Sequence, residues 1–266
     1  MSALPSLHVV GIGAWAPGAS DWQRLRGILR GEATPADDAP ARPAGTMLPA
    51  AERRRAPDGV RLVADIAAQA VAMAGIDPAN LPCVFASTHG ELAITDYVCE
   101  TLARTPLEMS PTKFHNSVLN APAGYWTIAT GCTAASSAVT AHHRSFAAGL
   151  LEAAVFACAE DVPVLFASSD VASAGPLGDM TRTTLAFGTA LVLVPRGSGG
   201  ARLDFGLGNA ADEPFIADGL ALHGVAGDNP TNAHALALLQ ALAVEEERRL
   251  RLPLSPGLSL DMEITF

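Results

Sequence analysis

The chain contains 266 residues with a formal net charge of −10, and 49% of its residues are hydrophobic but only 5% aromatic. The negative charge argues against nucleic acid and anionic membranes as partners, because both would repel the protein. No apolar run reaches the roughly 18 residues of a membrane span, and the first residues lack the basic and apolar regions of a signal peptide. We therefore expect a cytoplasmic protein without a membrane span.

The first predicted elements are a strand and a helix. Residues 7–13 predict a short buried strand that ends in glycines, and Asp21 and Gly31 predict the start and the end of a helix. The core must be built from Ala, Val, Leu and Ile, which suits helices packed closely on a sheet. The alternation of strand and helix that begins here predicts class α/β.

Gly11 and Gly13 follow this strand in a way that invites comparison with a dinucleotide-binding glycine motif. Pro17 and Gly18 fall where the helix of such a motif should open, and the third glycine is misplaced. We therefore reject that interpretation and expect no cofactor.

The next elements are a loop, a helix and a second strand. Residues 31–59 show no hydrophobic periodicity and predict a long surface loop. A helix is expected at 60–74, ended by Gly75, and a buried strand at 83–87. A further helix is expected at 91–104, with an apolar side formed by Leu92, Thr95, Val98, Cys99 and Leu102.

The central stretch, residues 110–164, predicts a loop, an apolar helix, a strand, a sharp junction, a second apolar helix and a second strand. We expect the loop at 110–112, the helices at 118–129 and 146–157, and the strands at 138–141 and 162–167. Pro122 suits the first turn of the first helix.

The remaining chain predicts a loop at 171–182, a buried strand at 185–194, a strand at 201–208 and an irregular stretch at 209–228. A helix should start at Asn229 and Pro230 and run to about Arg249, followed by a final strand at 258–264. We find no internal repeat. The chain therefore predicts a single domain over 1–266, with a core at about 7–195 and a short α/β extension at about 200–266.

The candidate chemistry centres on His142 and His143, which lie between a predicted strand and a predicted helix. A helix N-terminus at such a junction suits a nucleophilic cysteine, because the helix dipole lowers the pKa of a thiol. A histidine there would be neutral and a poor nucleophile for acyl transfer. The four cysteines lack metal-ligand spacing, so we expect buried reduced thiols and no metal site.

Cys132 is the rival nucleophile. Its surroundings, residues 128–133, look like a cysteine elbow, but it follows the end of a predicted helix instead of preceding one. The dipole there would raise the pKa of a thiol.

Several segments resemble β-ketoacyl synthases. The resemblance covers about residues 7–195 and rests on residues 9–14 with Pro17, the helix at 118–130, the block at 149–167 and the strand at 187–193. It implies the N-terminal half of a thiolase-like fold, a mixed sheet covered by helices, truncated relative to a full ketosynthase. Too few residues follow for a second half, which in that family supplies two catalytic histidines and a lysine. Residues 231–234 resemble a string from that half, but they open an ordinary amphipathic helix.

Anchoring the resemblance on both flanks places His143 at the degenerate nucleophile position, so it implies no catalytic residue. Residues 110–114 and 117–120 look like the short chain-length-factor-like proteins of aryl polyene clusters. That likeness implies a non-catalytic subunit that forms a heterodimer with an active β-ketoacyl synthase.

The same likeness implies an interface formed by residues 110–145, with the strand at 138–141 pairing across the dimer. The expected interface residues are Phe114, Ser117, Asn120, Ala138, Thr140, His142 and His143. Acyl carrier protein, usually acidic, should dock on the partner because this chain is itself acidic. Two alternatives stay open: a truncated acyl-transferring enzyme that uses Cys132, and a self-associating scaffold.

Overall fold

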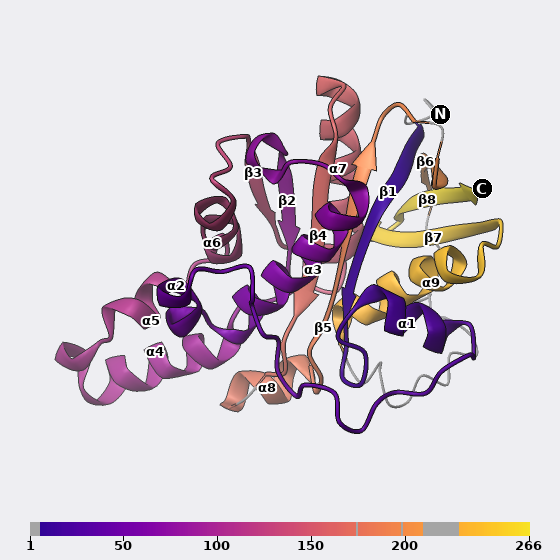
Figure 1. The fold of residues 1–266 in the computed structure, drawn as a ribbon. Helices are drawn as coiled ribbons and strands as arrows, with labels where there is room; N and C mark the ends of the chain where they lie inside the picture. The colour runs from indigo at the N-terminus through magenta and orange to yellow at the C-terminus, as the bar shows by residue number, and fades with distance from the viewer. Residues whose placement is uncertain (1–5, 174, 198, 210–228) are drawn as a thin grey trace.

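The computed structural model describes residues 6–173, 175–197, 199–209 and 229–266. One eight-stranded sheet in the order β3-β2-β4-β5-β1-β6-β8-β7 organises these residues, with helices on both of its faces (Figure 1). The predicted α/β class with a mixed, helix-covered sheet is confirmed. The strands are β1 (Ser6–Trp15), β2 (Cys83–Ala86), β3 (Ser136–Val139), β4 (Val164–Asp170), β5 (Phe187–Val194), β6 (Ala201–Gly208), β7 (Arg248–Ser255) and β8 (Leu258–Thr265).

The helices follow the predicted alternation with the strands. They are α1 (Trp22–Leu29), α2 (Ala50–Arg55), α3 (Asp58–Ala74), α4 (Leu92–Arg104), α5 (Pro111–His115), α6 (Ala121–Thr130), α7 (Ser145–Glu160), α8 (Gly175–Thr181) and α9 (Pro230–Val244), with 3-10 turns η1 (Pro78–Asn80) and η2 (Pro106–Glu108). No helix in the described ranges is both long and apolar enough to cross a bilayer.

The strands β3, β2 and β4 are parallel, whereas the remaining neighbours in the sheet pair antiparallel. The carboxyl ends of β2, β3 and β4 therefore meet at one edge of the sheet. This arrangement places the segments that follow β2 and β3 beside the end of β4, which is where α/β proteins commonly form their sites.

Two apolar layers hold the sheet. Alternate strand residues point to opposite faces, so Phe166 packs with α1, α7 and α9, whereas Leu165 packs with α3 and α6. The strands are almost continuously buried in β2, β4 and β5, as expected for a sheet covered on both sides.

Gly11 and Gly13, which gave β1 its similarity to a dinucleotide-binding motif, lie against the backbone of α3. A Cβ at either position would collide with the backbone carbonyl of α3, at Ala70 and Ile66 respectively. These glycines let α3 lie directly on the strand, a packing role that agrees with rejecting a dinucleotide site.

Three predicted loops contain helices. α2 lies within 31–59, α5 covers most of the segment expected as a loop at Ser110, and α8 lies within 171–182. None of the three helices buries a residue, so the hydrophobic periodicity that marks a helix in sequence is missing. In α5 a local cap forms instead, in which the Ser110 hydroxyl accepts a hydrogen bond from the backbone N–H of Lys113 at 3.4 Å.

The expected apolar side of α4 is correct at Leu92 but wrong at Cys99 and Leu102. The residues that α4 buries are Leu92, Ile94 and Thr101, whereas Cys99 is exposed and Leu102 is 57% exposed. Apolar residues lie on more than one side of α4, so the sequence of the helix does not show which side is buried. The packing of α4 against the rest of the protein decides that.

The predicted C-terminal helix is too long. α9 ends at Val244 with Glu245 in the left-handed conformation (φ 57°), and residues 248–255 form β7. Alternation of Arg and Leu is the reason: Leu250 and Leu252 are buried, whereas Arg249 and Arg251 form ion pairs with β8. β6, β7 and β8 continue the main sheet. Most of the irregular stretch expected at 209–228 lies outside the described residues.

Candidate functional site at the carboxyl ends of the parallel strands

The predicted strand-to-helix junction is present between β3 and α7. β3 ends at Val139, somewhat earlier than expected, and α7 begins at Ser145. His142 adopts a left-handed conformation with φ of 54°, which costs a non-glycine residue about 1 kcal/mol. The Ser145 hydroxyl holds the turn by donating to the His142 carbonyl at 2.7 Å and accepting from the Ala141 N–H at 2.9 Å.

The strained residue of this elbow is thus His142, one position before His143. The two imidazole rings meet edge to face, with centroids 3.9 Å apart and planes at 74°. Partial desolvation of its ring, and then the neighbouring His142, lower the pKa of His143. This direction favours the neutral imidazole at position 143.

A third histidine comes to the elbow from the far end of the chain. His234 on α9 is 6% exposed, and its Nδ1 has no hydrogen-bond partner among the described residues. Burial lowers the pKa of His234 to about 4, and electrostatic interactions with His143 and Arg144 add to that effect. The string at 231–234 lies beside the elbow, although it does open an ordinary helix, as the sequence indicates.

A buried carboxylate lies at the end of β4. Asp170 is 2% exposed, and its Oδ1 accepts hydrogen bonds from the Ser87 hydroxyl and the Thr88 N–H, both at 2.8 Å. Its Oδ2 accepts from the Thr231 hydroxyl at 2.8 Å. These three donors satisfy a charge that would otherwise be costly to bury.

Asp170 is not among the predicted site residues, because the strand was expected to end at residue 167. Ser168, Ser169 and Asp170, the polar residues that end β4 directly after its apolar run, are the signal that would have identified it. The network continues to the elbow, since the Thr140 hydroxyl donates to the Thr88 carbonyl at 3.1 Å. His89 also lies close, with Nε2 4.0 Å from Asp170 Oδ1.

Cys132 lies away from this edge of the sheet. It follows the end of α6, as predicted, is 7% exposed, and its thiol donates to the carbonyl of Leu81 at 3.4 Å. Leu81 precedes β2, so Cys132 lies near the amino end of β2. His142 instead follows the carboxyl end of β3, at the opposite end of these parallel strands. The adjacent thiol, Cys83, has its pKa raised to about 12 by burial.

The residues expected at an interface are mostly exposed. Ala138 is half-buried in β3, and the others are exposed: Phe114, Ser117, Asn120, Thr140, His142 and His143. Within the part of the chain that the structure describes, β3 lies at one end of the strand order and pairs with β2 alone. That outer edge offers backbone groups for another strand.

Exposed apolar side chains gather on the same side of the protein. We call residues 92–120 the arm; it contains α4, η2 and α5, which extend away from the sheet on the side of α6 and β3 (Figure 1). Large apolar side chains that are at least half exposed on the arm and on α6 are Leu102, Leu107, Phe114, Val118 and Ile128.

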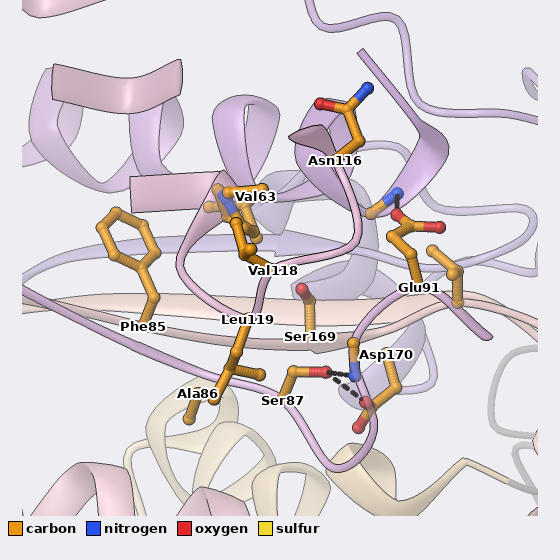
Figure 2. A pocket seen from close by; sticks show the side chains of 15 residues that line it. Val63, Phe85, Ala86, Ser87, Glu91, Asn116, Val118, Leu119, Ser169 and Asp170 are labelled. Atoms are coloured by element: carbon orange, nitrogen blue, oxygen red, sulfur yellow. Dashed lines mark hydrogen bonds between the residues drawn. The ribbon is translucent and has the colours of Figure 1, made fainter. Parts of the chain in front are cut away.

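A cavity of about 30 Å³ lies where the arm meets the body (Figure 2). Its walls come from α3, the ends of β2 and β4, and the segment 116–122, and its polar lining includes Ser87, Glu91, Ser169 and Asp170. Among the described residues, no group of three or more His, Cys, Asp or Glu side chains could hold a metal ion.

Comparison with known proteins identifies one family and several solved structures of similar fold. The profile of the family described as "Beta-ketoacyl synthase, N-terminal domain" matches residues 22–252. No curated protein matches significantly.

Three similar solved structures contain ketosynthases. A ketosynthase (ApeO) in complex with its chain length factor (ApeC) from Xenorhabdus doucetiae matches with a TM-score of 0.72 and 24% identity, over 97% of this chain and 99% of that chain. The ishigamide ketosynthase/chain length factor matches with a TM-score of 0.75 and 12% identity, over 98% and 99%. The third is the AntDE:AntF complex, a type II PKS acyl-carrier protein in complex with its ketosynthase bound to the hexaketide. It matches with a TM-score of 0.74 and 13% identity, over 98% of this chain and 99% of that chain. At these identities the likeness shows the fold.

Proposed function

The chain belongs to the family of β-ketoacyl synthase N-terminal domains, and from that premise we propose that it is a non-catalytic, chain-length-factor-like subunit. It pairs with an active β-ketoacyl synthase in the cytoplasm. The pair elongates an acyl chain in a pathway of the fatty-acid and polyketide type, of which aryl polyene synthesis is the expected example. This subunit contributes by shaping the partner's acyl tunnel.

The observation that carries the proposal is the elbow between β3 and α7. It has the geometry that would present a side chain at a helix N-terminus, and it holds His142 and His143 instead of a thiol. The lowered pKa of His143 supports a neutral imidazole, which is a weak nucleophile for acyl transfer. Cys132, the rival, is buried at the other end of the strands.

Two surface features support a heterodimer. The outer edge of β3 can accept a strand from a partner, and the arm offers exposed apolar side chains next to it. Together they suit an obligate-type interface of about 2,000 Å² or more. The solved structures that this chain resembles include complexes of a ketosynthase with a chain length factor.

The acyl carrier protein is an indirect partner in this proposal. The net charge of −10 makes this chain a poor docking surface for an acidic carrier. We expect the carrier to dock on the catalytic subunit.

Co-purification with the cognate β-ketoacyl synthase tests the pairing. We expect a stable one-to-one complex by size-exclusion chromatography with light scattering. A chain that stays monomeric and has no affinity for the ketosynthase would refute the proposal, and a homo-oligomer without such affinity would favour the self-associating scaffold.

A matched pair of variants locates the interface. Phe114→Asp should weaken the complex at least tenfold, because Phe114 is 61% exposed in the proposed interface. Phe266→Asp is the control, since Phe266 is 52% exposed at the end of β8, towards the other end of the strand order. Equal effects of the two variants would place the interface elsewhere.

Intact-mass analysis separates the proposal from acyl transfer. After incubation with acyl carrier substrates, we expect no adduct on this chain. An acyl adduct that disappears in Cys132→Ala would establish the enzymatic alternative.

A further inference from the structure

The charges of this acidic chain are unevenly distributed. Residues 41–61 and 109–151 together carry seven Arg and Lys side chains but only two acidic ones, Glu52 and Asp58, which gives a local charge of +5. The remaining residues carry ten basic and 25 acidic side chains, a charge of −15, and the two parts together give the net charge of −10. The two basic segments contain α2, α5, α6 and β3, so the side of the protein proposed as an interface differs in charge from the rest.

The helix α2 displays the densest part of this basic surface. Arg53, Arg54 and Arg55 follow one another in α2, and the helix buries none of its residues. It therefore adds no apolar side chain to the core, and polar contacts hold it in place instead. The Arg61 guanidinium of α3 donates to the carbonyls of Arg53 at 2.8 Å and of Ala56 at 3.1 Å.

The arm holds the end of α2 as well. Asn116, which directly follows α5, is 3% exposed, and its side-chain amide donates to the Arg55 carbonyl at 2.9 Å. The Tyr125 hydroxyl of α6 donates to Asn116 Oδ1 at 3.1 Å and so fixes the orientation of the amide. These contacts keep α2 beside α5 (Figure 1). A helix that buries nothing but is fixed through its backbone carbonyls serves to present its side chains.

The arginines of α2 are largely free of acidic partners. Arg249, an exposed arginine at the other end of the sheet, pairs with Glu263 at 2.9 Å. Within the described part of the chain, by contrast, the side chains of Arg53 and Arg54 form no ion pair. Neighbouring cations of this kind repel one another, so an anionic group from outside the chain would be attracted to them.

A groove of about 500 Å³ runs beside α2 and continues the basic surface. Lys113 lines the groove from α5, and its ammonium lies 3.6 Å from the centroid of the Tyr97 ring. Arg42 and Arg61 also line the groove, together with apolar residues such as Ile94. The groove therefore suits a peptide segment that carries both acidic and apolar side chains. We call the following residues the basic corner: Arg42, Arg53, Arg54, Arg55, Arg61 and Lys113.

The acidic residues that line the same groove are engaged within the chain. Asp58 pairs with Arg42 at 2.7 Å. Glu91, which directly precedes α4, accepts a hydrogen bond through its Oε1 from the Gly59 N–H of α3 at 2.5 Å. Neither carboxyl forms an ion pair with Lys113 in the described structure, so the Lys113 ammonium stays available to a partner.

The position of the basic corner indicates which partner it meets. It adjoins Phe114 and Val118, two of the exposed apolar side chains of the proposed interface. Protein interfaces have an apolar centre and a polar rim, and the basic corner has the place of that rim. Two copies of this chain that met through the same face would bring like charges together, which disfavours a second copy as the occupant.

We propose that the basic corner binds an acidic segment of the partner ketosynthase. The inference rests on the proposed function and adds to it the chemistry of the contact. Carboxylates of the segment pair with Arg53, Arg54 and Lys113, and its apolar residues enter the groove. Opposite charges then steer the two subunits together and set their orientation.

Carbodiimide cross-linking of the full-length complex tests the contact, because the reagent joins an amine to a neighbouring carboxylate as an amide with loss of water. Lys113 is the only lysine of the chain, so it and the N-terminal amine are the only amines that can react. We expect mass spectrometry to find Lys113 joined to an Asp or Glu of the ketosynthase. Lys113→Arg keeps the charge and removes the amine, so this cross-link should disappear while the complex still forms.

A complex without a Lys113 cross-link to the ketosynthase would overturn the inference. A cross-link of Lys113 to added acyl carrier protein, with none to the ketosynthase, would also overturn it, because the basic corner would then belong to the carrier. If no complex forms at all, the proposed function fails together with the inference, so the two failures are distinguishable.

Charge reversal gives a second, independent readout. The double variant Arg53→Glu with Arg54→Glu should weaken the complex about tenfold at roughly 50 mM salt and clearly less at roughly 500 mM, because salt screens exposed charges. Both variants should fold, since α2 buries no residue. Arg24→Glu with Arg249→Glu is the control, which reverses the same charge at exposed positions outside the basic corner. Equal weakening by the two double variants would contradict the inference.

Discussion

The Thr231 hydroxyl donates to Asp170 Oδ2 at 2.8 Å and so joins α9 to the end of β4. Asn229, the N-cap of α9, strengthens this junction, because its side-chain amide donates to the Asp170 carbonyl at 3.0 Å and to the Leu185 carbonyl at 2.7 Å. The C-terminal segment is thereby held against the elbow that contains His142.

Replacing the buried carboxylate should destabilise the fold. Asp170→Ala leaves Ser87, Thr88 and Thr231 without their acceptor, at about 1–3 kcal/mol for a buried unsatisfied group. We expect a loss of roughly 3 kcal/mol in denaturant unfolding. Asp179→Ala, at an exposed position of α8, is the control and should change stability by less than about 0.5 kcal/mol. Similar losses in both variants would disprove this role of Asp170.

His234 should make stability rise with pH in mildly acidic solution. Its folded pKa of about 4 lies below the ordinary value of 6.5, so the unfolded chain binds more protons between these values. Stability is therefore complete above pH 6.5 and decreases as pH falls towards 4, by about 1–3 kcal/mol. His234→Gln should remove this contribution, whereas His115→Gln, exposed on α5, should retain it.

Glu91 should act in the opposite direction over nearly the same range. Its folded pKa of about 7 exceeds the ordinary 4.5, so the folded chain binds more protons and stability falls as pH rises from 4.5 to 7. The two slopes partly cancel in the wild type. Glu91→Gln should show stability rising with pH, and His234→Gln should show it falling; parallel curves for the two variants would contradict both assignments.

Gly59→Ala should weaken the contact between α3 and the arm. Alanine normally stabilises a helix relative to glycine by up to about 1 kcal/mol, but here its Cβ displaces the Glu91 carboxyl. We expect a net loss of about 1–3 kcal/mol in thermal or denaturant unfolding. In the double variant with Glu91→Ala, the Gly59→Ala change should cost much less. Gly206→Ala is the control, because nothing lies near its Cβ; an additive double mutant would reject the contact.

A thiol placed at the elbow should be reactive. In a Cys99→Ser background, which removes the exposed native thiol, His142→Cys should be alkylated by iodoacetamide with an apparent pKa below the ordinary 8.5. The reason is the N-terminus of α7, whose dipole favours a thiolate. The pH dependence of alkylation of Cys99 in the wild type is the reference. An identical pH dependence at position 142 would show that the N-terminus of α7 does not lower the thiol pKa there.

Much of the fold could be predicted because it depends on local patterns. Apolar runs identify the strands that are buried on both faces, such as β4 and β5. Asp21 caps the start of α1, and Gly75 ends α3 in the left-handed conformation. The helices without a buried face, α2, α5 and α8, were missed, since no periodic pattern marks them. Position 143 as the elbow was an inference from flanking similarity, and the backbone places the left-handed turn at His142.

By itself, the sequence determined the α/β alternation, the strand-to-helix junction and the histidines at that junction, because each follows from residues close together in the chain. Only the tertiary structure decided that Asp170 meets Thr231, that His234 lies beside His143, and that the Glu91 carboxyl caps α3. In these three pairs the residues are 61, 91 and 32 positions apart in the chain, respectively. The parallel order β3-β2-β4 and the packing of α9 bring them together, and no local pattern contains that information.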